Sequence, residues 1–530
     1  MSGQPVTTSE QAWLAQARAL LLRSAQADAE ALVARALLEH PRSFELRRIR
    51  AGICRQTGCT AAAESLLTEL LAERPDDAGT AFALAGLLID QCRSSAAAAV
   101  MRASFEHARH GTELAIQAIE LLDGCHRPQD AAAIAEAAIA TDPDDPRLHA
   151  YAGMLEIQLG DFERARVHLL HALEHAPQAC EWHVPYGLAS MQRYDGPEHP
   201  DFARFRACLL RRDLSDKARS SLLFALAKAH DDIGDFVLAA EYSRQANALA
   251  HALTQWSSKH WRRAVDARLQ AGTIACAAAA QPDFTPVFVL GMPRSGTTLV
   301  AELLARHPQV CNRGETPWLA ALAQRAELVV NPDQPAIQRA ADAYAARLRQ
   351  DDTRGMRWFI DKQPLNFRYV DLILALFPSA RIVYCRRNAR DNALSLWMQS
   401  FAEEVQGFAY DFADIARVMR DCERLMAHWR KRYADSIHEV CYEQLTAAPE
   451  AVIAGLATWL QLPAAEADTV AARPAASINT ASVWQARQPV YARSTGRWRN
   501  YAACLPELLD FRADDPAGRP GQLRSNGNSR

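Results

Sequence analysis

The stretch TPVFVLGMPRSGTTLVAELLARHP, residues 285–308, decides the fold of the second half of this 530-residue chain. It opens with a short apolar run of β-type residues and closes with a helical pattern, so we predict a strand, a tight loop and a helix. Gly291 and Gly296 have the GxxxxG spacing of phosphate-binding loops, in which main-chain N–H groups meet a phosphate at the start of a helix. The stretch therefore predicts a P-loop-like α/β domain with a local anion site.

The loop lacks the lysine of ATP-binding loops, since Thr297 and Thr298 stand where Lys-Ser/Thr normally follows. A nucleoside triphosphate normally needs that lysine and a magnesium ion at its γ-phosphate, so a kinase or an ATPase is disfavoured. Arg294 instead places a permanent cation inside the loop, and Ser295 and the two threonines add hydroxyl donors. Such a loop suits a bridging phosphate attached to a transferable anion, and we expect no metal.

The string PRSGTTL, residues 293–299, resembles the 5′-phosphosulfate loop of the sulfotransferase family, whose members transfer the sulfuryl group of 3′-phosphoadenosine 5′-phosphosulfate (PAPS) to an acceptor. The resemblance runs from about residue 285 to 511. It points in particular to the tyrosylprotein sulfotransferases and to bacterial proteins that join tetratricopeptide repeats to a sulfotransferase domain. It implies a central parallel sheet and a PAPS-binding loop made of Arg294, Ser295, Gly296, Thr297 and Thr298.

A second stretch, ARIVYCRRNARDNALSLWMQ at residues 380–399, predicts a buried strand that ends in two cations and is followed by a helix. Arg387 and Ser395 can converge on one phosphate, because strand C-termini in doubly wound sheets face the ligand crevice. In the family this spacing binds the 3′-phosphate. The resemblance also implies three further PAPS-binding residues, which are Tyr442 in EVCYEQL and Ser482 and Arg497 in the late loop.

Sulfuryl transfer to a hydroxyl needs a base and cations near the bridging oxygen. Glu315 follows Arg294 by 21 residues, the offset of the glutamate base in tyrosylprotein sulfotransferases. His307 is the rival base, although its place at the end of the loop helix favours helix capping. DKQPLNF resembles the segment with the catalytic lysine, so Lys362 is expected to act with Arg294. The alternatives are that Glu315 is a plain surface acid and Lys362 a solvated charge.

The acceptor is left open by the sequence. The loop holds one acid, Glu315, and a proline at Pro317, whereas tyrosylprotein sulfotransferases carry a doubled acid and a basic residue that read acidic peptides. A peptide or protein tyrosine, a small phenol, or an amino or hydroxyl group of a glycan or lipid all stay candidates. The alternative function is a repeat-based interaction protein whose α/β domain binds nucleotide without turnover.

The N-terminal half, from about residue 10 to 250, is rich in Ala and Leu at helical spacing. Four prolines stand on a 34-residue ladder whose vacant rung is Arg109; they are Pro41, Pro75, Pro143 and Pro177. GDFERA at residues 160–165 recurs as GDFVLA at 234–239, and an insertion is expected near residues 194–202. This half resembles the tetratricopeptide repeat family, which implies an α-solenoid that binds the acceptor or a partner protein.

We therefore predict a multidomain α + α/β protein with a repeat solenoid (10–250), a helical connector (251–284), a sulfotransferase domain (285–511) and a disordered tail (512–530). The 59 basic and 62 acidic residues give a net charge of −3, which argues against nucleic acid and membrane partners. The arginines around Arg497 would also suit RNA, but phosphate and adenine explain them. Scattered cysteines and the lack of a leader or a long apolar run favour the cytoplasm, and a homodimer is left open.

Overall fold

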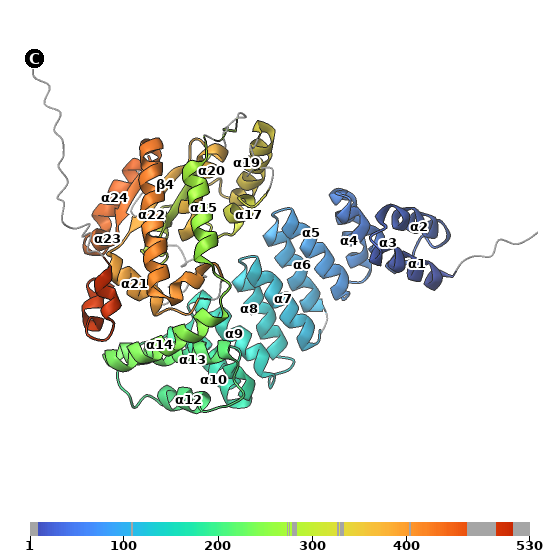
Figure 1. Ribbon diagram of the computed structural model, residues 1–530. Helices are drawn as coiled ribbons and strands as arrows, with labels where there is room; N and C mark the ends of the chain where they lie inside the picture. The colour runs from blue at the N-terminus through green and yellow to red at the C-terminus, as the bar shows by residue number, and fades with distance from the viewer. Residues whose placement is uncertain are drawn as a thin grey trace, which may run out of the picture. The chain divides into compact units, whose positions relative to one another are not determined.

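The computed structural model describes residues 9–107, 110–272, 274, 276–277, 283–325, 328, 333–401, 404–463 and 494–511. The chain, drawn in Figure 1, divides by its contacts into two compact units, Met1–Leu155 and Glu156–Arg530. The predicted vacant rung Arg109, the cofactor residue Ser482 and the tail 512–530 lie outside the described residues.

The first unit is a row of antiparallel helices of similar length. They are α1 (Glu10–Leu22), α2 (Gln26–Glu39), α3 (Phe44–Gln56), α4 (Thr60–Glu73), α5 (Ala78–Asp90), α6 (Ser94–His107), α7 (Thr112–Gly124), α8 (Pro128–Ile139) and α9 (Pro146–Leu159), which runs past the division. Pro41, Pro75 and Pro143 lie in turns between helices, and Gly58 adopts a left-handed φ of 81° after α3. Small residues such as Ala36 and Ala63 are fully buried, so neighbouring helices pack closely.

The second unit begins with more helices of the same kind. They are α10 (Phe162–His175), a 3₁₀ turn η1 (Pro177–Cys180), α11 (Val184–Ser190), α12 (Pro200–Leu209), α13 (Asp216–Asp232), α14 (Phe236–Leu253) and α15 (Ser258–Gln270). The two GDF copies have the same local structure. Gly160 and Gly234 have φ values of 86° and 80°. Asp161 and Asp235 cap the helices that follow by accepting from the N–H groups of Arg164 and Leu238.

A parallel five-stranded sheet forms the centre of the second unit. Its strands are β1 (Thr285–Gly291), β2 (Val310–Asn312), β3 (Trp358–Lys362), β4 (Arg381–Arg386) and β5 (Ile437–Cys441), in the order β2-β3-β1-β4-β5. The register pairs Val289 with Lys362 and Gly291 with Cys385. The carboxyl ends of β1, β3 and β4 therefore meet at one edge of the sheet, where ligands bind in such folds.

Helices cover both faces of the sheet. They are α16 (Thr297–Leu304), α17 (Trp318–Leu322), α19 (Gln334–Arg349), α20 (Val370–Leu376), α21 (Ala389–Trp397), α22 (Phe412–Arg432), α23 (Tyr442–Ala447) and α24 (Pro449–Trp459), with 3₁₀ turns η2 (Pro364–Tyr369), η3 (Glu404–Tyr410), η4 (Ala434–Ser436), η6 (Arg497–Tyr501) and η7 (Pro506–Asp510). Val287 and Val289 of β1 pack against α16 and α24, whereas Phe288 and Leu290 face a larger core formed with α15, α19, α20 and α22. In Figure 1, α15 and α22 lie side by side.

The predicted multidomain α + α/β class is confirmed, but the compact units divide the chain elsewhere than the predicted domains do. The residue pattern of the sequence changes within about residues 250–285. The packing of the structure, in contrast, divides the chain between Leu155 and Glu156. The reason is that Ala239 and Ala240 of α14 and Trp261 of α15 are buried in the same core as the sheet. The helices of residues 156–270 thus belong to the body that carries the sheet.

Candidate functional site

The loop between β1 and α16 can be built only with glycine at two positions. Gly291 has a φ of 145°, and a Cβ there would lie 2.3 Å from the carbonyl oxygen of Cys385. Gly296 has a φ of 98°, and its Cβ would lie 2.6 Å from Cδ2 of Tyr442. Arg294 between them is left-handed at 68°, a conformation that costs a non-glycine residue about 1–2 kcal/mol. Strain of this kind is typical of functional loops.

The loop presents a buried hydroxyl and is tied to α21. Ser295 is 2% exposed, and its Oγ has no hydrogen-bond partner among the described residues. Asn392 Nδ2 donates to the Pro293 carbonyl at 2.8 Å, and Arg294 Nε donates to Ser395 Oγ at 3.2 Å. A buried hydroxyl without a partner costs about 1–3 kcal/mol, so a ligand oxygen beside Ser295 would be stabilising.

Arg387, one residue after β4, lies against this loop. Its guanidinium donates to the carbonyl oxygens of Arg294 at 2.9 Å and Ser494 at 2.7 Å, and stacks 4.6 Å from the ring centre of Tyr442. Burial lowers the pKa of Arg387, yet an arginine stays charged in proteins. Its Nε has no partner within the described part of the chain. Arg387 and Ser395 thus both adjoin the loop, although Ser395 contacts Arg294 and not Arg387.

Glu315 and Lys362 form an ion pair at the end of β3. Arg313 N donates to the Ile360 carbonyl at 2.8 Å, and Lys362 N donates to the Gly314 carbonyl at 2.9 Å, so the loop after β2 runs alongside β3. This pairing brings Glu315 to Lys362, whose Nζ donates to Glu315 Oε1. The lysine side chain is 2% exposed and the glutamate side chain 22%. Lys362 is therefore no solvated surface charge, and Glu315 is no isolated surface acid.

Behind this pair lies Asp361, a buried carboxylate that the sequence interpretation missed. It is 1% exposed and accepts from Thr316 Oγ1 at 2.6 Å, Tyr344 OH at 2.5 Å and Asn366 Nδ2 at 3.3 Å. Burial raises its pKa to about 6, although these hydrogen bonds and Lys362 oppose the rise. The only sequence signal was its place directly before Lys362 at the end of a strand.

His307 has local partners just beyond the end of α16. Its Nε2 lies 2.9 Å from the Pro463 carbonyl, and its Nδ1 accepts from Gln309 N at 3.2 Å. Its main-chain N–H donates to the Leu304 carbonyl at 3.0 Å in the last turn of α16, the helix end at which helix capping was expected.

Arg497 points toward α13 in this structure. It forms an ion pair with Asp231 at 2.6 Å, and Tyr501 OH donates to the other oxygen of the same carboxylate at 2.5 Å. The loop around Arg497 is also held by Asp391 of α21, which accepts from Gly496 N at 2.6 Å and Trp498 N at 2.9 Å. Neither carboxylate was predicted. Asp391 follows β4 closely in sequence, but nothing in the sequence marked Asp231.

Together these groups make a cationic edge of the sheet next to a carboxylate. Arg294, Lys362 and Arg387 come from the carboxyl ends of β1, β3 and β4, and the N-terminus of α16 adds main-chain donors. Such an arrangement can bind a phosphorylated or sulfated nucleotide and accept a proton at Glu315. None of the helices in the described ranges has the length and apolar composition of a bilayer-spanning segment.

Comparison with known proteins matches two stretches of the chain to families. Residues 286–466 match the sulfotransferase family, and residues 126–183 match the tetratricopeptide repeat. The chain therefore carries a sulfotransferase-family domain preceded by tetratricopeptide repeats.

Two curated relatives match parts of the chain. It is 30% identical over 316 residues to an uncharacterized protein of Aquifex aeolicus, covering 56% of this chain and 41% of that protein. It is 34% identical over 139 residues to the nodulation protein NoeE of Sinorhizobium fredii, covering 22% of this chain and 33% of that one. The chain thus spans less than half the length of either relative.

Among solved structures, the sulfotransferase domain of the Synechococcus PCC 7002 olefin synthase is 20% identical, with a TM-score of 0.34 and coverage of 47% of this chain and 99% of that domain.

Proposed function

We propose that this protein is a PAPS-dependent sulfotransferase that transfers a sulfuryl group to an acceptor hydroxyl. The observation that carries the proposal is the pair of unused buried donors, Ser295 Oγ and Arg387 Nε, beside a glycine-built loop at the carboxyl edge of the sheet. Both donors lack a hydrogen-bond partner among the described residues. The oxygens of a bound phosphate or sulfate group would accept these two hydrogen bonds.

The residues of this edge fit such a donor. We propose that the loop residues hold the 5′ end, namely Arg294, Ser295, Gly296, Thr297 and Thr298. Arg387 and Ser395 would hold the 3′-phosphate, and Tyr442 would line the nucleotide site beside Gly296. Ser482 and Arg497 complete the set by family resemblance, with Arg497 sharing its charge with Asp231. When bound, PAPS supplies the sulfuryl group that is transferred.

In this proposal the chain's own groups perform acid–base and electrostatic work. Glu315 accepts the proton of the acceptor hydroxyl at Oε2, because Oε1 is occupied by Lys362 Nζ. Lys362 and Arg294 place positive charge where negative charge develops on the leaving oxygen. Lys362 is suited to this role, since its burial keeps water from screening it.

For the acceptor, we propose a hydroxyl of a protein or peptide, with tyrosine as the candidate that the family resemblance favours. The repeats support a protein partner, because stacked helix pairs present an extended binding surface. The chain has one acid in the Glu315 loop and Pro317 beside it, so the acceptor need not be acidic around the tyrosine.

The test is incubation of the full chain with radiolabelled PAPS and a panel of tyrosyl peptides, phenols and glycans, together with calorimetric titration of adenosine 3′,5′-bisphosphate. We expect transfer by the wild type and a kcat lower by about 10² to 10⁴ in Glu315→Gln, with nucleotide affinity unchanged. Failure to bind PAPS or the bisphosphate would refute the proposal. Binding without transfer to any acceptor would favour a nucleotide-binding interaction protein, and unchanged turnover in Glu315→Gln would remove that residue from its role.

A further inference from the structure

Tyr186 of α11 reaches from the helical part of the second unit to the end of α21. Gln399 Nε2 donates a hydrogen bond to the Tyr186 hydroxyl. The tyrosine ring is partly buried and packs against the apolar cluster of Leu223, Phe224 and Ala246. The phenol oxygen is thereby held at the segment that directly follows α21.

That segment leads back to the glycine-built loop. Ser395 lies in the last turn of α21, which ends at Trp397, and Gln399 follows that end by two residues. The Gln399 N–H donates to the Leu396 carbonyl at 3.1 Å, so a turn holds Gln399 against the end of the helix. Ser395 accepts from Arg294 Nε at 3.2 Å, and Gln399 one turn later contacts Tyr186. Arg294 and Tyr186 thus each contact a residue at the C-terminal end of α21, one through Ser395 and the other through Gln399.

The state of the phenol agrees with this placement. Burial raises the pKa of Tyr186 to about 12, while the Ser400 main chain and the positive charge of Arg294 act to lower it. The hydroxyl is consequently protonated at neutral pH and available as a hydrogen-bond donor.

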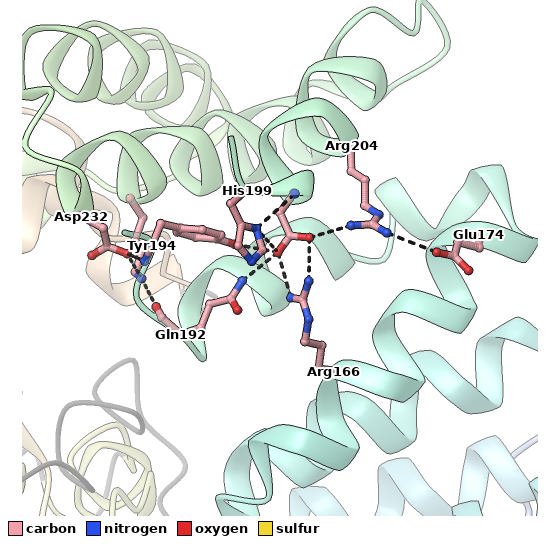
Figure 2. A network of polar contacts seen from close by, with 9 residues as sticks. Arg166, Glu174, Gln192, Tyr194, His199, Arg204 and Asp232 are labelled. Carbon is pink, nitrogen blue, oxygen red and sulfur yellow. Dashed lines mark hydrogen bonds and ion pairs between the residues drawn. The ribbon is translucent and has the colours of Figure 1, made fainter. Parts of the chain in front are cut away.

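A buried polar network follows the helix that carries Tyr186 and joins the stretch after α11 to α10, α12 and α13 (Figure 2). Asp201 is fully buried and accepts from both terminal nitrogens of Arg166 at 2.9 and 3.0 Å, from Gln192 at 2.7 Å and from Tyr194 OH at 3.0 Å. Tyr194 N in turn donates to Asp232 of α13 at 3.1 Å. Residues 192–201, which directly follow α11, are thus tied to α10 and α13.

We propose that Tyr186 is an acceptor-binding residue of the sulfuryl-transfer site, donating a hydrogen bond from its phenol to the acceptor substrate beside Arg294. This inference rests on the proposed function. It means that a residue outside the sulfotransferase-family match of residues 286–466 takes part in acceptor recognition. The acceptor class it fits is a molecule with a hydrogen-bond acceptor, such as a carbonyl or ether oxygen, next to its reacting hydroxyl.

The experiment compares wild type, Tyr186→Phe, Gln399→Ala and the control Tyr242→Phe in the full chain. Tyr242 packs against the same apolar cluster from α14, so its variant matches the loss of a hydroxyl there. The probes are radiolabelled PAPS with a tyrosyl peptide, 4-nitrophenol and glucosamine, and adenosine 3′,5′-bisphosphate for calorimetry. We expect Tyr186→Phe to lower kcat/KM for the acceptor about tenfold to a hundredfold with nucleotide affinity within about twofold. Gln399→Ala should act in the same direction, and Tyr242→Phe should resemble wild type.

The inference is overturned if Tyr186→Phe and Tyr242→Phe transfer equally well, or if Tyr186→Phe weakens nucleotide binding as much as it weakens turnover. Wild type that binds the nucleotide but labels none of the probes contradicts the proposed function, and the role of Tyr186 falls with it. A defect confined to the two variants, in an active wild type of equal thermal stability, supports Tyr186.

Discussion

Replacing Asp361 by asparagine should change how the stability of the protein depends on pH. Burial raises the pKa of this carboxyl from its ordinary 3.8 to about 6. The folded protein thus holds the proton more tightly than the unfolded chain. The stability from this group is fully present below pH 3.8 and is lost as pH rises through 6. One pKa unit is worth about 1.4 kcal/mol, so the loss amounts to about 3 kcal/mol.

The variant keeps a carbonyl that can accept from Thr316 or Tyr344 but has no proton to lose. We therefore expect the difference in unfolding free energy between Asp361→Asn and wild type to move in favour of the variant by about 2.4 kcal/mol between pH 4 and 7.5. Glu315 and Lys362 lie next to Asp361 and are present in both proteins.

The assay is urea unfolding at a series of pH values, followed by tryptophan emission. Ten of the eleven tryptophans come after residue 156, so the signal reports on the second unit. Asp342→Asn on α19 is the matched control, because that side chain is exposed and bonded only to Gln338 among the described contacts. A difference between Asp361→Asn and wild type that stays constant with pH would refute the reasoning.

Three further changes have defined outcomes. Gly296→Ala should weaken binding of adenosine 3′,5′-bisphosphate at least about tenfold by calorimetry, because its Cβ would lie 2.6 Å from the Tyr442 ring at a left-handed φ; Gly455→Ala, with open space around it, should not. Lys362→Met should abolish turnover and lower the unfolding free energy by about 3 kcal/mol, because it leaves Glu315 without its ion-pair partner. Adding Glu315→Gln to this variant should restore its stability but not its activity. A chain that begins at Pro146 should fold and bind nucleotide. A chain that begins at Thr285 should not fold, as measured by circular dichroism, because it lacks Trp261 and Ala239 of the core. A folded, nucleotide-binding chain from Thr285 would contradict this prediction.

The strand, loop and helix around residues 285–304 were predictable because local rules fix them. Apolar β-type residues form β1, and the two glycines allow the backbone angles of the loop. The proximity of Arg387 and Ser395 to the loop also followed, since parallel strands end at one edge of a sheet. That both residues bind one phosphate stays a prediction. The direct contact of Ser395 with Arg294 was not predicted, because the direction of a side chain depends on tertiary neighbours.

Features that join distant segments were not predictable. Asp231 meets Arg497 only because α13 packs against the late loop, and no local pattern records that contact. The pKa of Asp361 depends on its burial beside Tyr344 from α19. The division at residue 155 likewise reflects which helices share a core, whereas the repeat pattern of α13 and α14 resembles that of the helices before it.

The contact between Arg497 and Asp231 affects how the results of mutational scans of this protein should be interpreted. Asp231 neutralises an arginine that the family resemblance assigns to the nucleotide, yet it sits on a helix that pattern alone would allot to a partner-binding scaffold. Under the proposed function, substitutions that displace α13 or remove this carboxylate should score as defects in nucleotide use. A screen that assigns each phenotype to the region in which the substitution lies would then attribute these defects to lost partner binding. Measuring partner binding and nucleotide binding for every variant would separate the two causes.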